Sequence, residues 1–159
     1  MEYIYIGKLV NTHAPKGEVR IISDFEYKEK IFKQNKHLYI DTEQLTIESY
    51  RKHKNFDMVK FKEYNYINDV LKFKGKKVYT TREELNLNDN EILDSDYVTL
   101  RCLYKGKTIG FIEEVVNNNG YKLLKINNKY IPLNNNFIES IDLQNKQIIF
   151  KNLEGLIWK

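Results

Sequence analysis

The chain has 159 residues, of which 42% are hydrophobic and 13% aromatic, enough for one ordinary domain or two small ones with packed cores. It carries 26 Lys and Arg residues against 22 Asp and Glu residues, and no apolar stretch approaches the roughly eighteen residues of a membrane span. The amino-terminal residues do not form a secretory signal, and the single cysteine, Cys102, excludes an internal disulfide. We therefore expect a cytoplasmic protein without a membrane segment.

Positive charge is concentrated in one part of the sequence. Residues 51–77 contain nine basic and three acidic residues, whereas the rest of the chain is slightly acidic. A bias toward lysine, asparagine and isoleucine can follow from genome composition, so the net charge of +4 alone says little about the partner. A concentrated basic segment, in contrast, is typical of a surface that contacts phosphate groups.

Periodic patterns in the first 84 residues predict short strands and one short helix. Apolar and polar residues alternate, as in half-buried strands, at 3–9, 19–21, 38–40, 45–49, 58–61 and 77–81. The helix is expected over 70–73, begun by Asn68 or Asp69 and ended by Gly75. These elements predict an N-terminal domain over residues 1–84.

Residues 85–95 interrupt the strand pattern with polar and acidic turn formers, and we interpret them as a linker. Beyond the linker, strands are expected at 97–104 and 108–116, followed by a loop at 117–120 and by hairpins over 121–133 and 138–150. The C-terminal domain would then cover residues 96–159. Many short strands in two sets predict a mainly β chain made of two small antiparallel β-barrels.

The sequence carries no arrangement typical of an enzyme active site. It contains no nucleophile elbow, no glycine-rich phosphate loop and no H-E-x-x-H motif. Its three histidines lie far apart without partners at metal-ligand spacing, so no metal is expected. Cys102 lies in an apolar strand, which favours a buried, unreactive thiol over a nucleophile. We expect neither catalysis nor a cofactor.

A tight turn between two strands is predicted within residues 6–21. Gly17 is expected to supply a backbone angle that other residues resist. Around it, His13, Lys16 and Arg20 could offer phosphate contacts from the rim of the turn. For Lys16 and Arg20, a purely structural role and a phosphate-binding role are both left open.

The densest cationic run follows at residues 51–54, between two predicted strands. One interpretation is a solvated hairpin loop. The other is a loop whose Arg51, Lys52 and Lys54 side chains neutralise phosphates, which would make binding depend on salt. No base-reading module accompanies the run, so binding would be to backbone and shape, or to a protein presented on RNA.

Four segments follow one another in the order and spacing of one bacterial family. They are residues 6–21 with the sequence Gly-Glu-Val-Arg, residues 51–61 with the later stretch 75–85, residues 105–116, and residues 130–157. With these segments the chain resembles the ribosome maturation factor RimM family over essentially its full length. The resemblance implies an N-terminal RimM-type barrel and a C-terminal PRC-type barrel. The matching motif positions expected to be structural are Gly7, Gly17, Glu18, Pro132 and Gly155.

The resemblance also implies a function. The family consists of non-enzymatic factors that bind the immature small (30S) ribosomal subunit, help to form its head, and are associated with processing of 16S ribosomal RNA. Its PRC barrel is associated with the head protein S-nineteen. The protein would then act as a monomer without a cofactor, and the candidate contacts with the protein partner are Tyr97, Arg101, Lys105, Lys107 and Trp158.

The chain departs from the family pattern at several positions. Ala14 stands where the family usually has Gly after the His, and Ile92-Leu93 stand where the family commonly has a Tyr-Tyr pair linked to ribosome association. A role of that pair is therefore not carried over, although two apolar side chains would still allow the linker to dock against the second barrel.

Two alternatives belong to other functional classes. The first is a plain PRC-barrel interaction module without an RNA role, for which charge reversal of Arg51, Lys52 and Lys54 would leave binding intact. The second is an enzyme, because small barrels of the N-terminal kind also occur in flavin proteins. A colourless purified protein and the lack of a convergent His, Glu and Cys set would count against it.

Overall fold

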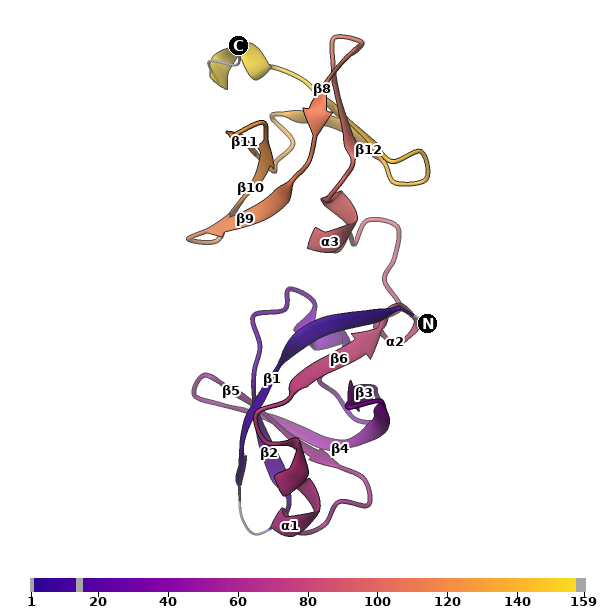
Figure 1. Cartoon of the computed structure of the whole chain (residues 1–159), viewed down its shortest axis with the longest axis vertical. Coiled ribbons are helices and arrows are strands. Elements are labelled where there is room, and N and C mark those ends of the chain that lie inside the picture. Colours follow the sequence, from indigo (N-terminus) through magenta and orange to yellow (C-terminus); the bar gives the residue numbers. More distant parts are fainter. Residues whose placement is uncertain (1, 14–15, 157–159) are drawn as a thin grey trace. The chain divides into compact units, whose positions relative to one another are not determined.

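The computed structural model describes residues 2–13 and 16–156, and it divides the chain into two compact units, residues 1–88 and 89–159 (Figure 1). Strands make up most of the regular structure in both units, which confirms the predicted mainly β class. The segment predicted as a linker is partly helical, because α2 (Arg82–Leu85) and α3 (Asp94–Tyr97) extend into its two ends. In the described part of the chain, no helix is long and apolar enough to cross a membrane.

The first unit is a closed barrel with the strand order β1-β2-β5-β4-β3-β6 (Figure 1). Every neighbouring pair of strands is antiparallel, and the closed sheet leaves no free edge. The strands are β1 (Tyr3–His13), β2 (Glu18–Ile22), β3 (His37–Ile40), β4 (Glu43–His53), β5 (Phe56–Phe61) and β6 (Lys77–Thr81).

Alternate strand residues fill the interior of this barrel. In β2, for example, Val19 and Ile21 are fully buried, whereas Glu18 and Arg20 are partly exposed on the opposite face. Burying each large apolar side chain contributes roughly 1.5–3 kcal/mol. The other fully buried strand residues include Leu9, Leu38, Ile40, Leu45, Ile47, Val59, Phe61 and Val78.

Bulges allow the long strand β1 to pair with two neighbours. The register shifts between Leu9 and Asn11 against β2, and between Tyr5 and Gly7 against β6. Gly7 is required at the second bulge, because a Cβ atom there would lie 2.5 Å from the carbonyl oxygen of Ile22. This result supports the structural role predicted for Gly7.

Short helical turns connect the strands of the first unit: η1 (Lys28–Lys30), α1 (Ile67–Val70) and η2 (Leu71–Phe73). The helix predicted over 70–73 begins earlier, at Ile67, so Asp69 lies inside its first turn instead of preceding it. From there the Asp69 carboxylate accepts the backbone N–H of Tyr66 at 3.1 Å, which satisfies one of the free donors at the helix start. Gly75 ends the segment with φ +83°, as predicted.

The second unit consists of two sheets, with strand orders β11-β10-β9 and β12-β13-β7-β8. The predicted hairpins form, and the turn at Asn127-Asn128 has the two positive φ values, 52° and 64°, of a type I′ turn. The strands are β7 (Arg101–Tyr104), β8 (Lys107–Phe111), β9 (Glu114–Asn118), β10 (Tyr121–Ile126), β11 (Lys129–Pro132), β12 (Ile138–Asp142) and β13 (Gln147–Phe150), and the turn η3 (Leu153–Leu156) follows.

The pairing of this unit differs from a closed antiparallel barrel. β13 lies parallel to β7, with Ile148 opposite Cys102, because the chain returns to the first strand of the unit after the β12–β13 hairpin. A periodic sequence pattern predicts strands but not the partners of strands that are distant in sequence. The core contains Leu100, Cys102, Ile112, Leu124, Ile126, Ile131, Ile148, Phe150 and Leu153.

Candidate functional site

Three predicted contacts of the first unit, His13, Arg20 and Arg51, lie together on the outer face of the barrel, on β1, β2 and β4. Met58 of β5 lies opposite Arg20 on one side and opposite Arg51 on the other, so the two arginines flank one residue. His13, at the end of β1, lies opposite Glu18 of β2. We call His13, Glu18, Arg20, Arg51 and Phe56 the arginine face.

Arg20 is held in place on this face by two contacts. Its Nη2 lies 3.2 Å from Nδ1 of His13 and donates a hydrogen bond when that nitrogen is unprotonated, and its guanidinium carbon lies 5.5 Å from the ring centroid of Phe56. Its Nε is buried and has no hydrogen-bond partner among the described residues. Arg20 is therefore a positioned, half-buried side chain on the rim of the turn.

Arg51 is engaged by a carboxylate. Its Nε and Nη2 donate to the two oxygens of Glu18 at 2.9 Å and 2.7 Å. This bidentate pair holds the pKa of Glu18 below its ordinary value, and the nearby His13 and His53 act in the same direction. The charge of Arg51 is therefore largely balanced within the protein, and the side chain is less available to phosphate than a free arginine.

Lys52 points away from the arginine face. Its Nζ lies 3.6 Å from Oδ1 of Asp57, a fully buried carboxylate that also accepts hydrogen bonds from Lys28 at 2.9 Å and from the Tyr50 hydroxyl at 2.6 Å. Burial and the neighbouring Asp57 raise the pKa of Tyr50 to about 12. These groups neutralise the buried charge of Asp57, and this gives Lys52 a structural role that does not require a phosphate partner.

Lys16 and Lys54 lie in the two turns that border the arginine face. Lys16 lies in the β1–β2 turn and Lys54 in the β4–β5 turn, where it adopts φ +55°. Both side chains are exposed, and neither has a hydrogen-bond or ion-pair partner among the described residues. Of the predicted phosphate contacts, these two lysines keep their charges most available.

The candidate partner contacts of the second unit differ in exposure. Arg101 and Lys107 are exposed on β7 and β8. Lys105, in the turn between these strands, forms an ion pair with Glu154 and lies 5.4 Å from the Tyr104 ring centroid. The interaction with Lys105, together with the Tyr104 hydroxyl, lowers the pKa of Glu154 to about 2.

The sequence predicts Tyr97 as the first residue of a strand and a partner contact, and the structure corrects the strand assignment. It is the last residue of α3 and is 8% exposed, packed in the core of the second unit. The short helix turns the ring inward, whereas an alternating strand would have left it on a surface. Trp158 lies outside the described residues.

The predicted structural positions also separate into two groups. Gly17 has φ +77°, and a Cβ atom there would lie 2.6 Å from the carbonyl oxygen of Tyr64. Pro132 ends β11, half-buried. Gly155, in contrast, has open space around it, so the structure gives no steric reason for glycine at that position.

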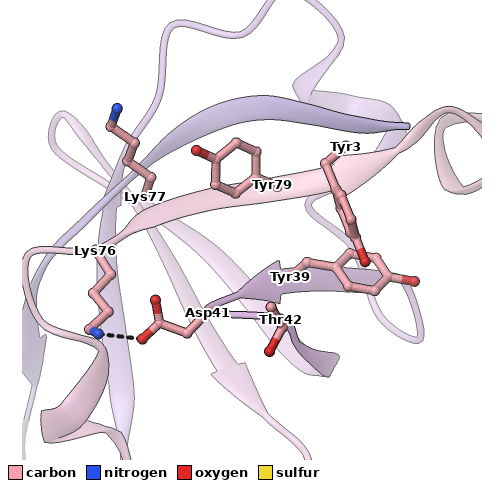
Figure 2. A pocket seen from close by; sticks show the side chains of 7 residues that line it. All are labelled: Tyr3, Tyr39, Asp41, Thr42, Lys76, Lys77 and Tyr79. Atoms are coloured by element: carbon pink, nitrogen blue, oxygen red, sulfur yellow. Dashed lines mark ion pairs between the residues drawn. The ribbon is translucent and has the colours of Figure 1, made fainter. Parts of the chain in front are cut away.

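Sequence reasoning missed a group of tyrosines on another face of the barrel. Tyr3, Tyr39 and Tyr79 line a hollow of 560 Å³ together with Asp41, Thr42, Lys76 and Lys77 (Figure 2). The alternation of Tyr3 and Tyr5 was visible in the sequence. Tyr39 and Tyr79 come together only because β3 pairs with β6. These strands are far apart in the sequence, so the sequence pattern does not reveal that they are neighbours.

Comparison with known proteins places the chain in a family. The family model of the RimM N-terminal domain matches residues 4–85. The ribosome maturation factor RimM of Geobacillus thermodenitrificans is 34% identical, over 96% of this chain and 94% of the relative. The chain belongs to the RimM family. The RimM protein of an Exiguobacterium species is 29% identical over 99% of this chain and 98% of the relative.

Two solved structures of RimM proteins are also similar to the chain. One is a 16S ribosomal RNA processing protein RimM from Pseudomonas aeruginosa, with a TM-score of 0.48 and 16% identity, covering 95% of this chain and 98% of that one. The other is the RimM N-terminal domain from Thermus thermophilus, with a TM-score of 0.48 and 17% identity, covering 57% of this chain and 100% of that one.

Membership of the RimM family confirms the resemblance seen in the four sequence segments. At the departure from the family's Tyr-Tyr pair, Leu93 is buried and Ile92 packs against the core of the second unit. The two apolar side chains thus hold this segment in place. Within residues 2–13 and 16–156, no group of three or more His, Cys, Asp and Glu residues is arranged to hold a metal ion.

Proposed function

We propose that the protein is a non-enzymatic accessory factor for late assembly of the small ribosomal subunit. In this role it binds immature subunits and assists maturation of the head and processing of 16S ribosomal RNA. The observation that carries the proposal is its nearly full-length similarity to ribosome maturation factors of the RimM family, combined with a surface that leaves two lysines available to phosphate.

The first unit would supply the RNA contact. Lys16 and Lys54 border the arginine face from two turns, so they can each neutralise a phosphate of one RNA backbone. Arg20 and Arg51 would act mainly by shaping the face between them, since both already have partners in the protein. Such binding recognises backbone shape and weakens as salt increases.

The second unit would supply the protein contact. We propose that it is the PRC-type domain of residues 96–159 and that it binds the head protein S-nineteen. The exposed Arg101 and Lys107 on neighbouring strands, with Lys105 in the turn between them, give this unit a positive edge. Lys105 contributes less charge than the other two, because Glu154 is its partner.

Selectivity for immature particles would explain how binding promotes assembly. A factor that binds two conformations equally shifts no equilibrium, whereas one that prefers the immature conformation raises the population that proceeds to the mature form. No covalent chemistry is needed. On this account the protein works as a cytoplasmic monomer.

Co-sedimentation tests the proposal. The purified protein would be centrifuged with free small subunits and with intact ribosomes at about 50 and 200 mM salt, a range over which phosphate contacts weaken. We expect association with free subunits alone, and weaker association at the higher salt. Association with neither particle would overturn the assembly role.

Charge reversal separates the RNA contact from a purely protein-binding module. The double variant K16E/K54E should bind subunits more weakly and with a smaller salt dependence than the wild type. The control K33E/K62E makes the same change in net charge at two exposed lysines of the first unit outside the arginine face. If K16E/K54E binds as well as this control, the interaction module without an RNA role becomes the better explanation.

A further inference from the structure

Four tyrosines cover the outer face formed by β1, β6 and β3. Tyr5 lies opposite Tyr79, and Tyr79 lies opposite Tyr39 on the other side, so the three strands bring one tyrosine each into a single row. Tyr3 joins the row from β1, with its ring centroid 5.2 Å from that of Tyr39. We call Tyr3, Tyr5, Tyr39 and Tyr79 the tyrosine face.

The rings of this face are open to solvent to an unusual degree. Tyr3 is 49% exposed and Tyr5 is 51% exposed, although each packs edge-on against a neighbouring ring, Tyr3 against Tyr39 and Tyr5 against Tyr79. The hollow lined by Tyr3, Tyr39 and Tyr79 has a volume of 560 Å³ (Figure 2), within the range of pockets that hold small molecules. The stability of the barrel does not explain why these rings are kept at the surface, since about half of Tyr3 and of Tyr5 remains exposed to water.

Lysines continue the row beyond the tyrosines. Lys8 of β1 lies opposite Lys77 of β6, on the same outer face as Tyr5 and Tyr79, and both side chains are exposed. No ion pair joins either of them to a described acid. Lys76 forms an ion pair with Asp41 at the border of the hollow (Figure 2). Near Tyr39, the carboxylate of Glu84 is engaged by the backbone N–H and Nδ1 of His37.

We propose that the tyrosine face binds a short run of unpaired RNA, with bases stacked on Tyr3 and Tyr5 and the backbone passing Lys8 and Lys77. Aromatic rings next to a positive track are the arrangement by which proteins hold single strands without reading their sequence. This binding surface shares no residue with the arginine face, although β1 contributes to both, and it goes beyond the proposed function.

An extended peptide fits this surface less well than RNA does. The barrel is closed, so β1, β6 and β3 offer no free edge to which a peptide strand could add. The residues that line the hollow are tyrosines, lysines, Asp41 and Thr42, with no aliphatic side chain to anchor an apolar peptide residue. A base needs only a ring face, and a phosphate needs only an ammonium group.

Oligonucleotide binding by the full-length protein tests this proposal without ribosomal particles. Fluorescence anisotropy would compare a labelled unpaired RNA of about twelve nucleotides with a duplex of the same sequence. We expect tighter binding of the unpaired strand. We expect Y3L/Y5L to weaken that binding about tenfold or more and Y3F/Y5F to retain it, because phenylalanine keeps the stacking ring.

Matched variants exclude trivial explanations. Y66L/Y121L removes two exposed tyrosines outside the tyrosine face and should bind the unpaired strand like the wild type. K8E/K77E should weaken the same binding through loss of the phosphate contacts. Because this variant leaves every tyrosine ring in place, it still tests the proposal if Y3L/Y5L folds poorly. Equal affinity for strand and duplex, or a loss in Y66L/Y121L as large as in Y3L/Y5L, overturns the proposal. Either outcome leaves the co-sedimentation result, and with it the assembly role, unaffected.

Discussion

Glu18 of β2 and Arg51 of β4 are joined by two hydrogen bonds that reach across the intervening strand β5. Strands separated by one neighbour lie about 10 Å apart, a distance that a long arginine side chain can bridge. Met58 of β5 lies opposite both Arg20 and Arg51 and is fully buried, although its neighbour Val59 fills the barrel interior. The ion pair and Arg20 therefore cover an apolar residue on the outside of the barrel.

Replacing Glu18 with Gln should lower the free energy of unfolding by about 1 kcal/mol near pH 7, because Arg51 loses its charged partner. The pKa of Glu18 is depressed below its ordinary value of 4.5 in the folded protein. The stabilisation is therefore present above about pH 4.5 and is lost as the pH falls through the folded-state pKa. Urea unfolding of wild type and E18Q should give curves that converge in acid, and a difference independent of pH would contradict this assignment.

Asp57 and Lys52 form an ion pair whose two members should differ sharply in importance. Asp57→Ala leaves Lys28 and the Tyr50 hydroxyl without their buried partner and should cost roughly 3–5 kcal/mol of unfolding free energy. Lys52→Ala removes a half-exposed ammonium at 3.6 Å and should cost less than about 1 kcal/mol. Denaturant titration of both variants measures the contrast. Equal losses would show that Lys52, and not Lys28, is the main partner of the carboxylate.

The local patterns of the first unit were predictable because they depend on neighbouring residues. Alternation in Val19–Ile21 and Leu45–Ile47 reports which face of a strand is buried, and Gly17 and Gly75 mark positions where φ is positive. The same local logic predicted Cys102 as a buried thiol. Family membership followed from four segments in order, each short enough to be read directly.

The parts that failed depend on which strands become neighbours. The residues near Arg51 in the sequence do not predict its pairing with Glu18. The two side chains meet because β2 and β4 both pair with β5, on its opposite sides. The parallel pairing of β13 with β7 has the same origin. The availability of a cation for phosphate is set by such distant partners: Arg51 and Lys52 each face a carboxylate, whereas Lys16 and Lys54 have no partner among the described residues.

Gly17 and Gly75 allow backbone strain to be separated from steric collision. Both have positive φ, 77° and 83°, but a Cβ atom at Gly17 would lie 2.6 Å from the Tyr64 carbonyl oxygen, whereas nothing lies within 4 Å at Gly75. Gly75→Ala should cost about 1–2 kcal/mol from the left-handed conformation alone. Gly17→Ala should cost clearly more, because the backbone must also move. Thermal unfolding should rank the two variants in that order, and the reverse order would show that the β1–β2 turn yields easily.

Cys102 should be unreactive until the second unit unfolds. Burial raises the pKa of its thiol to about 12, so almost no thiolate is present near pH 8, and the sulfur is fully buried opposite Ile148. A thiol reagent added to the native protein should react with Cys102 no faster than the protein unfolds. In denaturant, the same reagent should react at the rate of a free thiol. Cys102→Ser places a hydroxyl in the apolar core and should cost about 1–3 kcal/mol. Rapid labelling of the native protein would show that β7 opens locally while the rest of the fold is intact.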